Sequence, residues 1–245
     1  MSAPFPTRKQ EQWRYADLEA LQPIWEQLAE PESIAVLPGQ SVEQVWVPGT
    51  DEVQVRRVQL VLGEGAKARI FALNTAAHYG RIELGVTLAD DADFELFGAN
   101  IGGGSSNLEI VTNVRHDGQR GRSRQTVRSV LGGKAVGTYL GKVEVARDAQ
   151  KTDAEQSVKA LLLDRGAMAN CKPELEIFAD DVKCAHGASV GELDADQLFY
   201  AMSRALDPAT ARALLLEGFV MGLWDDAPAG EPIRDLARAA LRAIA

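Results

Sequence analysis

Polar and apolar residues alternate in short segments along the chain between residues 42 and 193. Val53–Leu62 and Arg81–Leu88 show the period of two that half-buried strands require. Clusters of Gly and Asp separate such segments, as in residues 63–66 and 89–93, and these residue types tolerate the backbone angles of tight corners. This pattern predicts a mainly β structure for the middle of the chain.

The early corners at Gly63, Ala89 and His116 recur at about the spacing of one solenoid coil. This recurrence favours a parallel β-helix, in which each coil pairs its backbone with the next and inward side chains stack into one apolar core. A two-sheet sandwich remains the alternative, because hairpins give similar local alternation. In a solenoid the terminal coils have unpaired strand edges, which must be capped or pair with another subunit.

The two ends of the chain have other patterns. Before residue 42, aromatic residues such as Trp13 stand among charged ones and are interpreted as packing residues of an irregular or helical segment. After residue 193 the period is helical, with Asp194 and Asp207 as predicted N-caps and Pro232 at the start of a last helix. The predicted parts are an N-terminal segment (1–41), a β-helix core (42–193) and a C-terminal helical module (194–245).

In the second of these C-terminal helices the apolar residues follow one stripe, which is predicted to be the buried face. Its members are Ala211, Leu214, Leu215, Phe219 and Leu223.

The composition narrows the range of partners and compartments that we expect for this chain. The 245 residues include 35 acidic and 26 basic side chains, a net charge of −9 that disfavours nucleic acid or an anionic membrane as partner. Only two cysteines are present, which fits a reducing compartment. The sequence shows neither a signal peptide nor an uncharged apolar run of about 20 residues that would span a bilayer. We therefore expect a cytoplasmic protein without a membrane partner.

Cys184 and His186 are the strongest candidates for chemistry. In a strand, residues two apart face the same side, so a thiol and an imidazole can share one soft-metal site. Two ligands do not complete a tetrahedral site, and taken alone the pair is better explained as a buried thiol beside a hydrogen-bonded imidazole. A metal would need ligands from elsewhere in the chain or from a partner.

The other candidates are weaker. Cys171 precedes Lys172-Pro173 and is predicted to lie at a corner, while His78 and His116 are predicted to be surface residues in turns. The glycine-rich segment 102–106 lacks the Lys-Ser/Thr ending of a phosphate loop and is predicted to be a turn.

Two longer motifs resemble the SufB/SufD family. Residues 6–18, with Arg8-Lys9 followed by Glu11, Trp13 and Tyr15, are similar to a segment of its SufD branch. Residues 170–193, with Lys172-Pro173, Ala179-Asp-Asp-Val182, Cys184-x-His186-Gly187 and Val190-Gly-x-Leu193, resemble the family's C-terminal signature. The resemblance covers about residues 6–223. Set against typical members, we expect this chain to be a short member without their N-terminal helical region.

This resemblance implies a right-handed parallel β-helix with a C-terminal helical region. It also implies a non-enzymatic scaffold in iron–sulfur cluster assembly, which pairs with a SufB-like subunit and docks a SufC-like ABC ATPase. A homodimer is the alternative to the SufB-like pair.

Carried onto this sequence, the resemblance makes His186 a ligand to a nascent cluster or iron, with Cys184 assisting. The metal would be transient and shared with a partner, and the isolated chain is not expected to bind it tightly. The C-terminal helices would form the ATPase-docking surface, through Arg204, Ala211, Leu215 and Phe219.

Two other functions compete. A β-solenoid enzyme, either an acyltransferase or a carbohydrate-active protein with His186 as base, should carry a hexapeptide repeat or a carboxylate pair, and neither is evident. A passive homodimeric adaptor would need no metal ligand, so substitution of His186 separates it from the scaffold.

Overall fold

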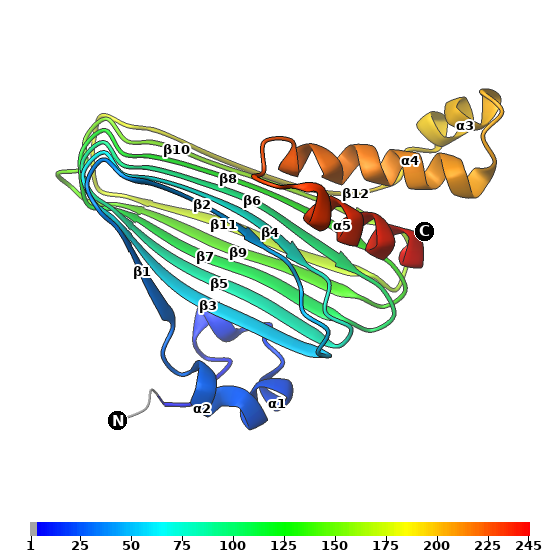
Figure 1. Cartoon of the computed structure of the whole chain (residues 1–245), viewed down its shortest axis with the longest axis horizontal. Helices are drawn as coiled ribbons and strands as arrows, with labels where there is room; N and C mark the ends of the chain where they lie inside the picture. Colours follow the sequence, from blue (N-terminus) through cyan, green and yellow to red (C-terminus); the bar gives the residue numbers. More distant parts are fainter. Residues whose placement is uncertain (1–3) are drawn as a thin grey trace.

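The computed structural model describes residues 4–245 and shows two parallel β-sheets that face each other as the two sides of a solenoid (Figure 1). Successive strands alternate between the sheets, so the first has the order β1-β3-β5-β7-β9-β11 and the second β12-β10-β8-β6-β4-β2. This arrangement confirms the parallel β-solenoid with C-terminal helices. The sandwich is excluded because all strand pairs are parallel.

The strands of the first sheet are β1 (Glu32–Val36), β3 (Val53–Leu62), β5 (Tyr79–Leu88), β7 (Asn107–His116), β9 (Val136–Val145) and β11 (Met168–Ile177). Those of the second are β2 (Ser41–Trp46), β4 (Lys67–Asn74), β6 (Asp93–Gly102), β8 (Arg122–Leu131), β10 (Asp153–Leu162) and β12 (Lys183–Glu192). The strand region therefore begins at Glu32, before the predicted boundary at residue 42, because β1 is too short to show a clear alternation.

One column of corners joins the first sheet to the second. Its residues in the left-handed region of backbone space are Gly39, Gly65, Asp91, Arg120 and Lys151. Backbone bonds link successive corners, as between the Gly65 N–H and the Asp90 carbonyl and between the Asp91 N–H and the Gln119 carbonyl. The guanidinium of Arg120 also contacts the Asp91 carboxylate at 2.7 Å, so each corner supports the next.

The core fills the space between the sheets. Residues at every second strand position point inward, for example Leu60, Leu84 and Val143, and they form one apolar cluster along the solenoid. His116 belongs to this inward set and is fully buried, with Nε2 2.9 Å from the Ser123 hydroxyl oxygen. The prediction that His116 lies at the surface was wrong. His116 is the last residue of β7, and its ring points into the core instead of belonging to the turn that follows.

Short helices precede the strands and lie against the outer face of the first sheet (Figure 1). They are η1 (Glu11–Trp13), α1 (Leu18–Leu21), η2 (Gln22–Ile24) and α2 (Trp25–Leu28). Trp13 and Trp25 pack edge to face with their ring centroids 5.6 Å apart, and both are buried. Trp13 is therefore a packing residue, as predicted, and Trp25 packs with it.

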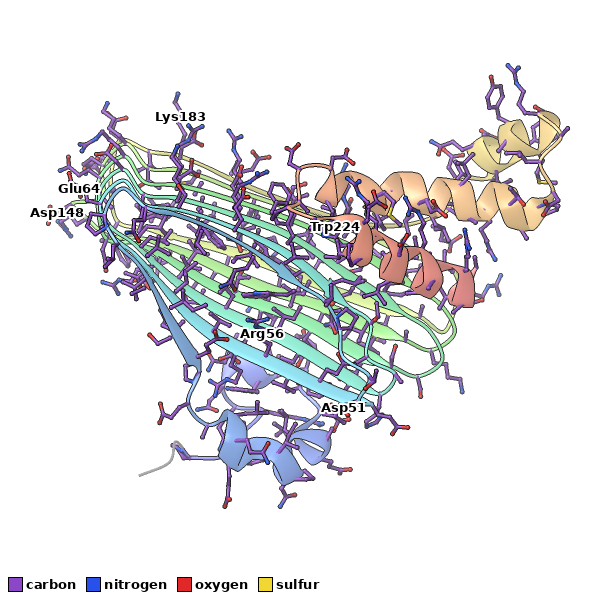
Figure 2. All side chains as sticks on the ribbon, in the orientation of Figure 1. Asp51, Arg56, Glu64, Asp148, Lys183 and Trp224 are labelled. Atoms are coloured by element: carbon purple, nitrogen blue, oxygen red, sulfur yellow. The ribbon has the colours of Figure 1, made fainter. Side chains whose placement is uncertain are left out.

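The C-terminal helices are α3 (Ala195–Ser203), α4 (Pro208–Val220), η3 (Met221–Trp224) and α5 (Glu231–Ile244). The carboxylates of Asp194 and Asp207 accept backbone N–H bonds at the starts of α3 and α4, so both predicted caps are confirmed. Helices α4 and α5 cover the outer face of the second sheet, where buried Trp224 donates to the Phe97 carbonyl at 3.3 Å (Figure 2). Helix α3 projects beyond the sheets with the start of α4 (Figure 1).

The predicted buried stripe of α4 was partly wrong. Ala211 and Leu223 are buried, but Leu214 is 56% exposed and Leu216 and Val220 take the buried face. Three consecutive leucines, at 214–216, leave the choice of face open in the sequence, and contact with the second sheet decides it.

Candidate functional site

The solenoid ends in an open coil. Strands β11 and β12 each pair with only one neighbour, β9 and β10, so both have an unpaired backbone edge. Almost all residues of β12 are exposed, whereas those of β10 alternate between buried and accessible. The inward-facing side chains of β12 are therefore not covered by a further coil, whereas those of the earlier coils are.

Cys184 and His186 lie on this last strand and face the interior. In the parallel register Cys184 is opposite Ala154 and His186 is opposite Gln156, two buried residues that point inward. Cys184 is half-buried against the end of the apolar core, and His186 is exposed. The spacing of two residues thus brings a thiol and an imidazole to one side of the open coil.

Cys171 faces the same opening from the other sheet. It lies within β11 opposite the inward-pointing Tyr139 and packs half-buried against the core, so its predicted corner position was wrong. Pro173, which suggested the corner, is tolerated because β11 is an edge strand. We call Cys171, Cys184 and His186 together the terminal mouth.

Both thiols of the terminal mouth are held in the protonated form. Burial raises the pKa of Cys171, and burial likewise raises the pKa of Cys184, helped by the nearby Asp153 carboxylate and opposed by a hydrogen bond with the Ala154 backbone. A thiol is a strong metal ligand only as thiolate, so metal binding here would have to displace a proton. Both cysteines are free of disulfides.

Within residues 4–245, no group of three or more His, Cys, Asp or Glu side chains has a geometry that would hold a metal ion. The terminal mouth thus offers soft donors without a closed site. Cys184 and His186 fit a metal or cluster as partial ligands, and their metal role remains a prediction.

Behind the terminal mouth lies a buried polar cluster that the sequence reading missed. The Tyr139 hydroxyl donates to Gln125 Oε1 at 3.1 Å, accepts from Gln156 Nε2 at 3.0 Å and lies 3.3 Å from the Thr112 hydroxyl. Burial raises the pKa of Tyr139 to about 12, which keeps the hydroxyl protonated. The position of Gln156 between Ala154 and Val158, at every second residue, was the available signal.

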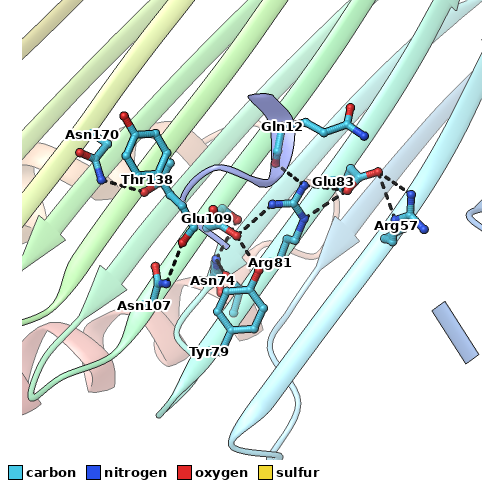
Figure 3. Close-up of polar contacts among 12 residues, drawn as sticks. Gln12, Arg57, Asn74, Tyr79, Arg81, Glu83, Asn107, Glu109, Thr138 and Asn170 are labelled. Carbon is cyan, nitrogen blue, oxygen red and sulfur yellow. Dashed lines mark hydrogen bonds and ion pairs between the residues drawn. The ribbon is translucent and has the colours of Figure 1, made fainter. Parts of the chain in front are cut away.

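A second buried cluster lies beneath the N-terminal helices (Figure 3). The Arg81 guanidinium is fully buried, contacts Glu109 at 2.9 Å and Glu83 at 2.8 Å, and lies 3.9 Å from the centre of the Trp13 ring. It also donates to the Gln12 carbonyl at 2.9 Å. The Trp13 ring and the Gln12 carbonyl therefore attach the N-terminal segment to the first sheet through Arg81.

The predicted docking residues are divided between surface and core. Arg204 is exposed and donates to the Tyr200 hydroxyl at 2.7 Å, and Leu215 lines the same face half-buried. Phe219 packs partly buried against the sheet under Arg128, and Ala211 has no exposed surface in this chain.

An apolar hollow of about 600 Å³ separates α3 from the start of α4. Tyr200, Arg204, Leu206, Leu214 and Leu215 contribute to its walls. Phe199, which is 73% exposed, lies on the same short helix α3. Soluble proteins seldom expose so many large apolar side chains together unless these contact a partner.

His78 is exposed as predicted, with Nε2 3.4 Å from the Asp17 carboxylate. Across residues 4–245, none of the helices combines the length and the apolar character that crossing a membrane requires.

A family model and individual similar proteins both point to the same family. Residues 41–219 match the model of the SufBD core domain of the SUF system for FeS cluster assembly. The SufBD family protein slr0076 of Synechocystis, described as an iron–sulfur cluster assembly protein, is 31% identical over 73% of this chain and 40% of its own length. The chloroplastic protein ABCI7 of Arabidopsis thaliana is 42% identical over 54% of this chain and 28% of its own.

The iron–sulfur cluster assembly protein SufD of Escherichia coli is 38% identical over 42% of this chain and 24% of its own length. The matched region thus spans 40% or less of each of these relatives.

Proposed function

The chain belongs to the SufBD core family of the SUF system, and from this membership we propose that it is a non-catalytic scaffold subunit in iron–sulfur cluster assembly. One structural observation supports the proposal in addition to the family membership. Cys184 and His186 face the interior of an open last coil, beside two unpaired strand edges, where a partner can reach them.

The proposed partner at this end is a SufB-like subunit. Strands added beyond β11 and β12 would extend both sheets, satisfy the free backbone groups and cover the inward side chains of β12. A second copy of this chain is the alternative, because its own edges have the same geometry.

Such pairing would also complete the metal site. His186 is the proposed ligand and Cys184 the assisting one, while the partner supplies the remaining donors for an iron or cluster that is cargo rather than a resident group. The His186 imidazole is exposed and accessible to a metal. The Cys184 thiol must first lose its proton, because burial raises its pKa. The cargo would then be held only in the paired complex.

The proposed site for a SufC-like ABC ATPase is the hollow between α3 and α4. Two residues, Leu193 and Asp194, connect this module to β12, the strand that carries Cys184 and His186. ATP-driven movement of a docked ATPase would therefore act on the terminal coil over a short covalent path and change access to the terminal mouth.

The test is anaerobic co-expression with SufB-like and SufC-like proteins, followed by affinity purification and analysis for iron and sulfide. The proposal predicts a complex that contains both partners and carries iron and sulfide, while this chain purified alone carries neither in stoichiometric amount. Failure to recover the SufB-like subunit under these conditions would refute the pairing.

A further inference from the structure

One inward column of the second sheet leads from the solenoid core to the terminal mouth. Gln125 of β8 is in register with Gln156 of β10, which is in register with His186 of β12. Neighbouring backbones in a parallel sheet are about 4.8 Å apart, so each side chain in such a column lies directly against the next. His186 is thus the outermost member of a polar column.

The amide of Gln156 is bonded to the buried cluster at one end only. Its Nε2 donates to the Tyr139 hydroxyl, whose single proton goes to Gln125 Oε1. Turning the Gln156 amide over by itself would require the Tyr139 proton and would leave Gln125 Oε1 without a donor. In the arrangement that the structure shows, Oε1 is the free end of the Gln156 amide, as Nε2 is the free end of the Gln125 amide.

That free end has no hydrogen-bond partner at the side-chain positions that the structure shows. Gln156 is 1% exposed, and its Oε1 is a buried acceptor without a hydrogen bond. An unsatisfied buried acceptor is costly, and the polar side chains that adjoin Gln156 in the column are Gln125, whose Oε1 is bonded to Tyr139, and His186. Both Gln156 and His186 line a groove of about 380 Å³.

We infer that Gln156 is a positioning residue for His186: its Oε1 accepts a hydrogen bond from one ring N–H, and so fixes the tautomer. A neutral imidazole has one N–H and one lone pair, so the nitrogen that faces Gln156 carries the proton and the other presents its lone pair at the terminal mouth. Such partners orient metal-binding histidines. The functional meaning rests on the proposed ligand role of His186, but the hydrogen bond itself does not.

The test reads the tautomer of His186 in the whole, metal-free chain by long-range 1H–15N NMR of the imidazoles above neutral pH. The chain has three histidines, so the spectrum of His186→Ala identifies the His186 signals. Gln156→Met keeps the volume and removes the acceptor. It should change the ratio of the two His186 tautomers about fivefold, as expected for one hydrogen bond.

The matched control is Thr112→Val, which removes the other hydroxyl beside Tyr139 but changes neither glutamine and does not adjoin His186. It should leave the His186 tautomer dominated by the same form as the wild type. Tyr139→Phe, which frees the Gln156 amide to turn, should weaken the preference and serves if Gln156→Met does not fold.

An unchanged ratio in Gln156→Met, or in Tyr139→Phe where that variant is used, would overturn the inference. An equal change in Thr112→Val would also overturn it, since the effect would then come from general loss of the network. Because no cargo is present, failure here leaves the ligand role of His186 untouched, and loss of that role would leave the hydrogen bond standing.

Discussion

His116 should make the stability of the fold depend on pH in mildly acidic solution. The ring is buried between the sheets, where a side chain at Gly121 would come within 2.7 Å of Nδ1, and that nitrogen has no hydrogen-bond partner. Burial lowers the pKa of His116 from 6.5 to about 4, although the nearby Asp117 opposes the shift. The folded chain therefore keeps this histidine neutral.

The sign and size of the effect follow from linkage. Between pH 6.5 and about 4 the unfolded chain binds a proton at His116 that the folded chain refuses, so stability falls as the pH falls through this window. Full stability from this group is present above pH 6.5. A difference of about 2.5 in pKa corresponds to about 3 kcal/mol in total, of which about 2 kcal/mol is lost by pH 5.

The perturbation is His116→Gln, which keeps a hydrogen-bonding end near Ser123 and removes the titration. Urea unfolding at pH 8 and pH 5, at equal ionic strength, gives the free energy of unfolding of both proteins. The wild type should lose about 2 kcal/mol more than the variant over this interval. His78→Gln, which removes an exposed imidazole, controls for loss of a histidine as such. An identical loss in wild type and His116→Gln would refute the reasoning.

Three further predictions concern stability and docking. Glu109→Leu removes the buried partner of Arg81 and should lower the free energy of unfolding by about 3 kcal/mol in urea titrations; a loss under about 1 kcal/mol would contradict a buried ion pair. Asp207→Ala removes the N-cap of α4 and should cost about 1 kcal/mol in thermal unfolding, whereas an unchanged midpoint would show that the cap is dispensable. Leu214→Glu, in the apolar hollow, should weaken binding of a SufC-like ATPase at least tenfold in calorimetry, whereas the control Leu236→Glu on α5 should not; equal effects would move the docking site elsewhere.

Much of the fold could be predicted because its signals are local. Strand alternation gave β3 (Val53–Leu62) with its observed bounds, and the caps at Asp194 and Asp207 depend only on neighbouring backbone groups. The spacing of Gly63 and Ala89 indicated stacked coils, because every coil repeats the same corner.

What failed depends on contacts between distant segments. His116 and Gln156 are polar residues in the solenoid interior, and only the neighbouring coils show that they are buried. Cys171 looked like a corner residue because Pro173 follows it, and only the sheet order shows that β11 is an edge strand. The buried face of α4 is chosen by the sheet that it covers, which the sequence of three leucines does not specify.

The candidate site was predicted in part. The sequence singled out Cys184 and His186, and the strand period placed them on one side, as the structure does. The sequence did not indicate that this side is the interior of an open last coil, with Gln156 and Tyr139 behind it. That arrangement is visible only when the register of β10 and β12 is known.

The central claim is that His186 is a ligand to the nascent cluster, and one measurement tests it most directly. His186→Ala and the control His78→Ala are each co-expressed anaerobically with SufB-like and SufC-like partners, and the purified complexes are analysed for iron and sulfide. Because His186 is exposed, its removal should leave folding intact, as circular dichroism would show. We predict that the His186→Ala complex assembles but loses its iron and sulfide, while the His78→Ala complex keeps both. Wild-type iron and sulfide in the His186→Ala complex would contradict the account.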